Sequence, residues 1–167
     1  MSARDDAFKV LFRDHWSAVV AYLVRRLYTP AEAQDIAAEV FIVALAKLDP
    51  DDPFRRAWLL RTAENKLQTQ NRGDMRRAKV TAQMAQLMAD PPARAVTDDL
   101  LDLQAALTRL PKRERAVMEM AYWDDLTASD IALVLGISTH AVEMRLSRAR
   151  KRLRAMIHER AREGELL

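Results

Sequence analysis

The chain has 167 residues, which allows one large or two small domains, and it is rich in Ala, Leu, Arg and Met but has only three Gly, a composition typical of helical proteins. It has no Cys, which excludes disulfides and cysteine-ligated zinc, and its apolar runs are too short to span a membrane. The formal net charge is only +3, but Lys and Arg concentrate in two zones, 51–80 and 112–162, so we expect two contacts with a polyanion such as nucleic acid.

Apolar residues recur at helical spacing and no run alternates in polarity, so we expect an all-α fold. The first helix is predicted from Asp5 to Leu27, with one wide buried face. A second helix begins at Thr29 and Pro30, which suit an N-cap and a first helical position, and continues to Leu48. Since no signal-peptide core precedes these helices, we expect a cytoplasmic protein without membrane insertion.

The second helix carries two unlike surfaces. A core stripe is predicted at Ile36, Val40, Ala44 and Leu48. The C-terminal half is apolar nearly all round, which is typical of a helix that is central in a bundle or packed on a partner. Asp35 and Glu39 lie one turn apart on another side, where they favour a partner contact or, more simply, interact with the helix dipole.

A third, basic helix is predicted over 54–71, after the stiff loop at 49–53. Its cations lie near Trp58, and cationic helices with aromatic residues suit single-stranded nucleic acid, because bases stack on the rings and cations contact the phosphates. The simpler interpretation, that Trp58 is a core residue, stays open and is favoured by the apolar spacing. We take 1–78 as the first domain and 79–97, which contains a Pro-Pro pair, as a linker.

The second domain is predicted to hold four helices within 98–162, followed by a tail at 163–167. Leu100, Leu103, Leu107 and Leu110 form the stripe of its first helix, and Pro111 begins the next. The last two helices are joined by a tight turn: Thr127 and Asp130 can form a capping box, Gly136 suits a left-handed C-cap, and Ser138 can cap the final helix.

The final helix has one apolar side and one basic side. Its predicted buried stripe is Val142, Leu146, Ala149, Leu153 and Met156, and its other surface is rich in Arg. A helix, a Gly-containing turn and a second, basic helix is typical of a DNA-binding helix-turn-helix. The simpler alternative is a helical hairpin with a solvated basic face.

With both halves in view, the chain resembles the extracytoplasmic-function (ECF) class of bacterial RNA polymerase sigma factors of the sigma-70 family. The most specific motifs are L-x-x-A-L-x-x-L-P-x-R-x-R at 103–115, D-I-A-x-x-L-G-I-S at 130–138 and V-E-M-R-L-S-R-A-R-x-R-L at 142–153. The first domain matches at A-x-D-I-A-A-E-V-F (33–41) and W-L-L-R-T-A-E-N (58–65). The final helix-turn-helix alone would also suit response regulators of a related type, so the N-terminal match separates the two.

The resemblance implies three partners: core RNA polymerase, promoter DNA and an anti-sigma protein. It implies that the first domain binds polymerase and captures the opened strand of the −10 element, and that the second reads the −35 element. Polymerase-binding residues are then expected at Asp35, Ile36, Glu39 and Phe41. Strand capture is expected at Arg55, Arg56, Arg61, Asn65 and Arg72. The −35 contacts are expected from His140, Glu143, Met144, Arg145, Ser147 and Arg148.

Glu143 departs from the family pattern, which often has Lys or Arg there. An acid at a base-facing position repels phosphate but can accept a hydrogen bond from cytosine N4. We therefore expect an altered −35 preference.

Two other functional classes compete with a sigma factor. A stand-alone helix-turn-helix regulator would bind an operator as a dimer and would need a dimerisation surface, for which 31–48 is the only candidate. An enzyme is disfavoured, because the three His are scattered and no metal-ligand spacing or Gly-rich phosphate loop appears. No cofactor, metal or catalytic residue is therefore predicted.

Overall fold

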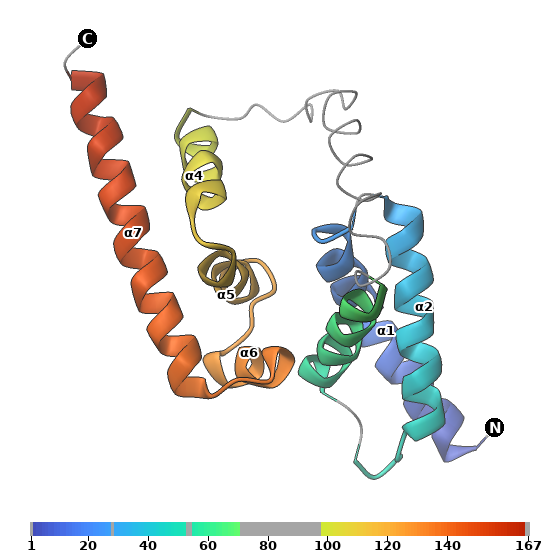
Figure 1. The fold of residues 1–167 in the computed structure, drawn as a ribbon. Coiled ribbons are helices and arrows are strands. Elements are labelled where there is room, and N and C mark those ends of the chain that lie inside the picture. The colour runs from blue at the N-terminus through green and yellow to red at the C-terminus, as the bar shows by residue number, and fades with distance from the viewer. Residues whose placement is uncertain (1, 28, 53–54, 71–97, 166–167) are drawn as a thin grey trace. The chain divides into compact units, whose positions relative to one another are not determined.

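The computed structural model describes residues 2–27, 29–52, 55–70 and 98–165 (Figure 1). Within these ranges the chain is helical apart from short connections, and an isolated bridge between Asp49 and Asp52 is the only strand-like pairing, so the predicted all-α class is confirmed. The chain divides into two compact units, an N-terminal one with the helices before residue 71 and a C-terminal one built on the four helices after residue 97. The predicted linker at 79–97 lies outside the described residues.

The N-terminal unit begins with two antiparallel helices, α1 (Ala3–Val24) and α2 (Pro30–Lys47). Helix α1 starts before its predicted position because Ser2 forms a capping box: its Oγ accepts from Asp5 N at 3.2 Å, and its own N–H donates to Asp5 Oδ2 at 3.1 Å. Thr29 caps α2 as predicted, with Pro30 in the first turn. A third helix, over residues 56–70, follows the 49–52 turn.

Among the described residues, the core of the N-terminal unit is mostly aliphatic and includes two buried aromatic side chains, Tyr22 and Phe41. The predicted α2 stripe, Ile36, Val40, Ala44 and Leu48, is buried throughout. Leu59, Leu60, Ala63 and Leu67 cover it from the 56–70 helix, whereas Trp58 is only half-buried. Tyr22 is fully buried, and its hydroxyl donates to Glu64 Oε2 at 2.6 Å, which ties α1 to the 56–70 helix.

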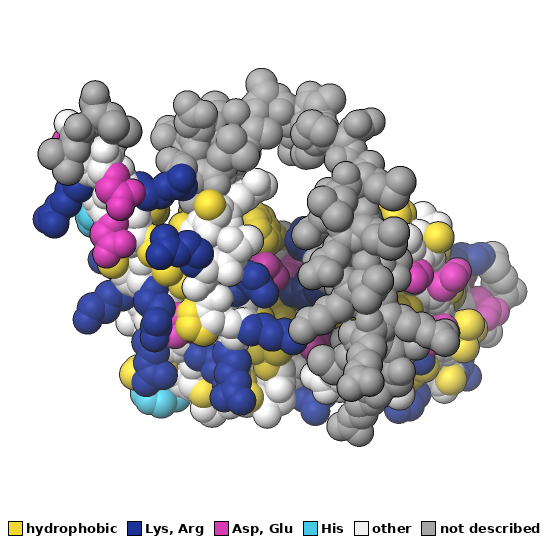
Figure 2. Space-filling model, turned by 45° about the horizontal axis from the view of Figure 1, so that its top comes forward, with side chains coloured by type: hydrophobic (Ala, Val, Ile, Leu, Met, Phe, Trp, Pro, Cys, Tyr) yellow, Lys and Arg dark blue, Asp and Glu magenta, His cyan; other side chains and the backbone are white. Residues whose placement is uncertain are grey.

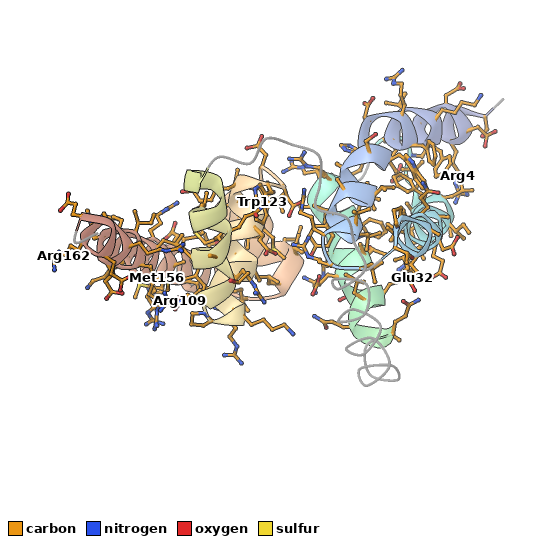
Figure 3. The ribbon with its side chains drawn as sticks, turned by 90° about the horizontal axis from the view of Figure 1, so that it is seen from above. Arg4, Glu32, Arg109, Trp123, Met156 and Arg162 are labelled. Carbon is orange, nitrogen blue, oxygen red and sulfur yellow. The ribbon has the colours of Figure 1, made fainter. Side chains whose placement is uncertain are left out.

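An aromatic cluster on the first half of α1 packs on Phe41 of α2, whereas Ile42 and Leu45 of the same helix remain 67% and 39% exposed. The rings of Phe12 and Trp16 have their centroids 5.1 and 5.6 Å from that of Phe41, which is 3% exposed. Phe12 itself is 40% exposed, so the predicted buried face of α1 is narrower than its sequence indicates. Beyond this cluster, the Arg4 side chain donates to the carbonyl oxygens of Leu45 and Ala46 at the end of α2 (Figure 3).

The C-terminal unit contains α4 (Asp98–Arg109), α5 (Lys112–Tyr122), α6 (Ala128–Leu135) and α7 (Thr139–Glu165). Helix α7 packs along α4 and α5 and continues to Glu165, into the tail predicted at 163–167 (Figure 1). Leu107 and Leu110 of the predicted α4 stripe are buried, but Leu103 is 38% exposed. Leu103 lies on the groove side of α4 but is only partly covered, because it lines an open apolar groove between α4, α5 and α7.

Candidate nucleic-acid interface

The turn between α6 and α7 is fixed by local hydrogen bonds. Thr127 Oγ1 accepts from Asp130 N at 3.1 Å and the Thr127 N–H donates to Asp130 Oδ2 at 3.4 Å, which confirms the predicted capping box. Gly136 adopts φ 66° and ψ 36°, the left-handed conformation that favours glycine. Ser138 Oγ then accepts from Ala141 N at 3.1 Å at the start of α7. These bonds set the angle at which α7 leaves the turn.

The buried side of α7 is the side that its sequence predicts. Val142 and Ala149 are fully buried, Leu146 and Leu153 are 7% exposed, and Met156 is half-buried. Because these residues pack on the other helices of the unit, the opposite side of α7 faces outward.

The predicted base-facing residues lie on the outward side of α7. His140, Met144 and Ser147 share one face of the helix at spacings of one turn, and all three are exposed. Glu143 and Arg148 are exposed on the two flanks of this face, whereas Arg145 is half-buried nearer to the core. Figure 2 shows Lys and Arg side chains gathered over the C-terminal unit. An exposed helix of this kind, presented by a rigid turn, can enter a major groove and contact bases and phosphates.

Two arginines farther along α7 also contact α5, although both side chains stay exposed. Arg150 Nε donates to the Tyr122 hydroxyl at 3.0 Å, and Arg152 Nε lies 3.1 Å from Glu114 Oε2. Glu114 is 7% exposed, and the contact with Arg152 is a charge contact without hydrogen-bonding geometry. Sequence reasoning assigned all of these arginines to one basic surface, because nothing local indicates partners that lie far away in the sequence.

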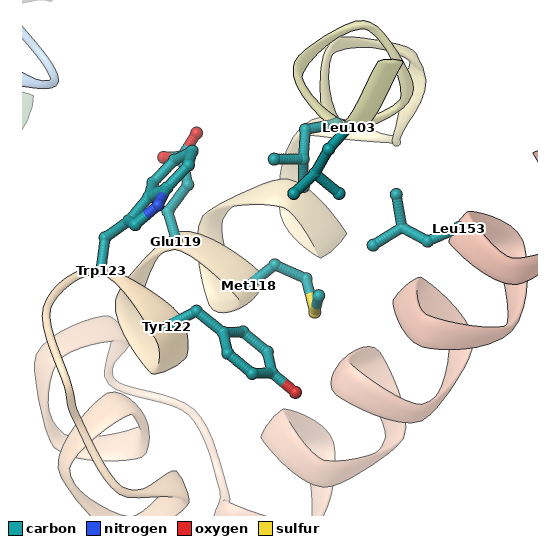
Figure 4. A pocket seen from close by; sticks show the side chains of 7 residues that line it. Leu103, Met118, Glu119, Tyr122, Trp123 and Leu153 are labelled. Atoms are coloured by element: carbon teal, nitrogen blue, oxygen red, sulfur yellow. The ribbon is translucent and has the colours of Figure 1, made fainter. Parts of the chain in front are cut away.

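An apolar groove lies between α4, α5 and α7 (Figure 4). Its volume is about 260 Å³, and Leu103, Met118, Tyr122 and Leu153 are among its lining residues. Tyr122 and the adjacent Trp123 are 61% and 48% exposed. The groove and the outward side of α7 are therefore different surfaces of this unit, one apolar and one cationic.

The predicted strand-capture residues come from the start and the middle of the 56–70 helix. Arg55 and Asn65 are exposed, and Arg56 and Arg61 are half-buried. Arg72 lies outside the described residues. Burial holds the pKa of the nearby His15 below its ordinary value; the Asp14 carboxylate acts in the opposite direction, and Arg56 lowers it further.

The predicted polymerase-binding residues of α2 separate into two pairs. Asp35 and Glu39 are exposed, whereas Ile36 and Phe41 are each 3% exposed and belong to the core. Ile36 and Phe41 are therefore not surface residues of the unit, and the assignment of these four residues to polymerase binding stays a prediction. Glu39 Oε2 also lies 3.2 Å from Lys66 Nζ on the 56–70 helix, a contact between distant residues that sequence reasoning missed.

The described residues offer no site for a metal ion and no membrane-spanning helix. Over 2–27, 29–52, 55–70 and 98–165, no three side chains of the metal-ligating types gather. In the same part of the chain, no helix combines the length and the hydropathy needed to cross a membrane.

Two family models match the chain, one in each half. The model of sigma-70 region 2 matches residues 11–77, and that of sigma-70 region 4 matches residues 100–153. Together they cover well over half of the chain.

Curated relatives match along nearly the whole chain. The ECF RNA polymerase sigma factor SigW of Bacillus subtilis (strain 168) is 28% identical, with 92% of this chain and 90% of SigW covered. The RNA polymerase sigma factor CnrH of Cupriavidus metallidurans is 29% identical, with 93% of this chain and 89% of CnrH covered.

Solved structures share the fold. The structure of CnrH in complex with the cytosolic domain of CnrY has a TM-score of 0.60 at 26% identity and covers 94% of this chain and 96% of CnrH. The sigma factor RpoE, solved with the anti-sigma factor NepR from Bartonella quintana, has a TM-score of 0.62 at 23% identity, with 90% of this chain and 96% of RpoE covered. This last likeness concerns the fold alone.

Proposed function

The chain belongs to the sigma-70 family and is an RNA polymerase sigma factor of the ECF type, and from this premise we propose how its two units divide the recognition of a promoter. The C-terminal unit reads the −35 element as duplex, and the N-terminal unit binds core polymerase and captures one strand of the −10 element. The observation that carries the proposal is the succession of region 2 and region 4 in one chain, each on its own helical unit.

The outward side of α7 supports the assignment of −35 reading. His140, Met144 and Ser147 would face the base edges, Glu143 would reach a base edge from one flank, and Arg148 would contact phosphate on the other. A good bidentate contact to a base edge in the major groove contributes discrimination of about 1–3 kcal/mol. Phosphate contacts add affinity that does not depend on sequence. The fixed turn at Gly136 keeps both kinds of contact in register.

The 56–70 helix supports the assignment of strand capture. Arg55, Arg56, Arg61 and Asn65 would contact the backbone and an unstacked base of the displaced strand, and Arg72 would extend the cationic track. Cationic and amide side chains on a rigid helix suit a melted strand, since every phosphate can be contacted without a defined base. Domain boundaries at 78 and 98 remain part of this proposal.

The exposed acids of α2 support the assignment of polymerase docking. Asp35 and Glu39 lie one turn apart and can be reached by a partner, whereas Ile36 and Phe41 would support α2 from within the core. Melting a promoter costs several stacking steps of about 1.4 kcal/mol each. A chain of this size would therefore depend on binding energy from polymerase.

An anti-sigma protein is the remaining proposed partner. CnrH, which is similar to this chain in sequence and in structure, was solved with the cytosolic domain of CnrY. We propose that this chain is likewise held by a partner protein when it is not bound to polymerase.

Transcription in vitro with bacterial core polymerase and a randomised promoter library tests the proposal. The expected result is initiation at defined sites that share two elements, only when the chain is present. A chain that neither joins core polymerase nor directs initiation, and instead binds a palindrome as a dimer, would contradict it.

A further inference from the structure

We propose that Lys66 is a phosphate contact of the captured DNA strand and that Glu39 keeps it neutralised until polymerase engages α2. The inference rests on the proposed function, because it joins the docking helix to the strand-capture helix. It concerns a residue that neither the sequence motifs nor the predicted site includes.

The first observation is the pairing itself. Lys66 Nζ lies 3.2 Å from Glu39 Oε2, and the two side chains are 28% and 51% exposed. The pair joins α2 to the 56–70 helix, so each partner belongs to a helix with a different proposed role. The carboxylate cancels the positive charge that Lys66 would otherwise present to a phosphate.

The second observation is the position of Lys66 on its helix. It follows Asn65 directly, and Asn65 is exposed on the proposed strand-binding side. Lys66 therefore lies on the flank between that side and α2. The four-carbon stem of lysine is flexible, so the ammonium can turn from a carboxylate on α2 toward a phosphate beside Asn65.

The third observation is that Asp35 and Glu39, two of the three acids of α2, differ in their pairing. Asp35 has no ion-pair partner among the described residues, whereas Glu39 is paired with Lys66. A cationic surface of polymerase that binds both acids would compete with Lys66 for Glu39. Exposed ion pairs contribute little stability, so such a competitor displaces Lys66 at small cost. Docking then adds one cation to the strand site.

The first experiment measures the phosphate contact in the holoenzyme. A promoter on which the wild-type holoenzyme initiates is prepared with its −10 strand unpaired, and its affinity is measured over a range of salt concentrations. Each phosphate contact to a single strand steepens the logarithmic salt dependence by about 0.7. Lys66→Gln is expected to reduce the slope by that amount, whereas the control Lys9→Gln on α1 leaves it unchanged. A Lys66→Gln slope equal to that of the wild type overturns the proposal.

The second experiment measures the neutralisation by Glu39 in the absence of polymerase. The full chain binds fluorescein-labelled oligo(dT) at low salt, a suitable probe because phosphate contacts carry no sequence information. Glu39→Gln is expected to bind several-fold more tightly than Asp35→Asn, which removes the same charge without touching the pair. Adding Lys66→Gln to Glu39→Gln should abolish the gain. Equal binding by the Glu39 and Asp35 variants, including no binding by either, overturns the proposed role of Glu39.

The two experiments separate this inference from the proposed function. If the wild-type chain directs no initiation, the proposed function fails. If it directs initiation and the Lys66→Gln slope is unchanged, only the role of Lys66 fails.

Discussion

Gly136 is the residue on which the geometry of the recognition helix depends most directly. Its φ of 66° and ψ of 36° lie in the left-handed region, where a residue with a Cβ is disfavoured by roughly 1–2 kcal/mol. Replacing Gly by Ala also removes conformational freedom from the unfolded chain, which offsets about 0.4–1 kcal/mol. Gly136→Ala is therefore expected to lower the free energy of unfolding of the C-terminal unit by about 1 kcal/mol.

Gly164 supplies a control on the same chain, because replacing it by Ala should not lower the stability. It lies inside α7, and a Cβ added there would meet no atom within 4 Å. Gly inside a helix costs roughly 0.5–1 kcal/mol relative to Ala, and less near a helix end that frays. Gly164→Ala should therefore leave the stability unchanged or raise it slightly.

Thermal unfolding followed by circular dichroism tests the pair of variants. For a unit of this size, a loss of 1 kcal/mol corresponds to a fall in Tm of about 4–8 °C. If Gly136→Ala unfolds at the wild-type temperature, or if Gly164→Ala is the less stable variant, the account of the turn is wrong.

Three further predictions concern specificity, packing and pH. In a selection from randomised −35 sequences, Glu143→Lys should remove a preference for cytosine at one position, a preference worth about 1–3 kcal/mol. Glu159→Lys on the same helix is the control. The same preference in the wild type and in Glu143→Lys would contradict a reading role for Glu143. Tyr22→Phe should cost about 1–2 kcal/mol in chemical unfolding, because Glu64 loses a hydrogen bond of 2.6 Å but stays partly hydrated; an unchanged midpoint would show that this bond contributes nothing. The pKa of His15 is lowered in the folded chain, so as the pH falls below the ordinary value of 6.5 the unfolded chain protonates His15 before the folded chain does. Acidification should therefore lower the free energy of unfolding of the wild type more than that of His15→Gln. The same dependence of unfolding free energy on pH in both proteins would refute this.

The helix-turn-helix was predictable because its signals are local. The capping box at Thr127 and Asp130, the left-handed Gly136 and the α7 stripe all lie within one short stretch, and each was found where the sequence placed it. The α2 stripe was equally clear, because burial on one side of a helix leaves a periodic pattern in the sequence.

The contacts between helices were not predictable, since they join residues that are distant in the sequence. The pairs Glu39–Lys66 and Arg152–Glu114 are of this kind. Periodicity also cannot tell which apolar residues of a helix are buried most deeply. Phe41, predicted as a polymerase-binding residue, is buried against Phe12 of α1. Its position was identified by resemblance, whereas its burial depends on which helix packs beside it.

The central claim is that one chain holds a duplex element with one unit and an opened strand with the other while bound to polymerase. Footprinting of the complex of chain, polymerase and promoter tests both parts of this claim at once. A cleavage reagent reports which duplex positions are protected, and permanganate reports which thymines are unpaired. The account predicts protection at −35 together with reactive thymines at −10, and reactivity only when polymerase and the chain are both present. Protection of a palindrome by the chain alone, with no reactive thymines when polymerase is added, would contradict it.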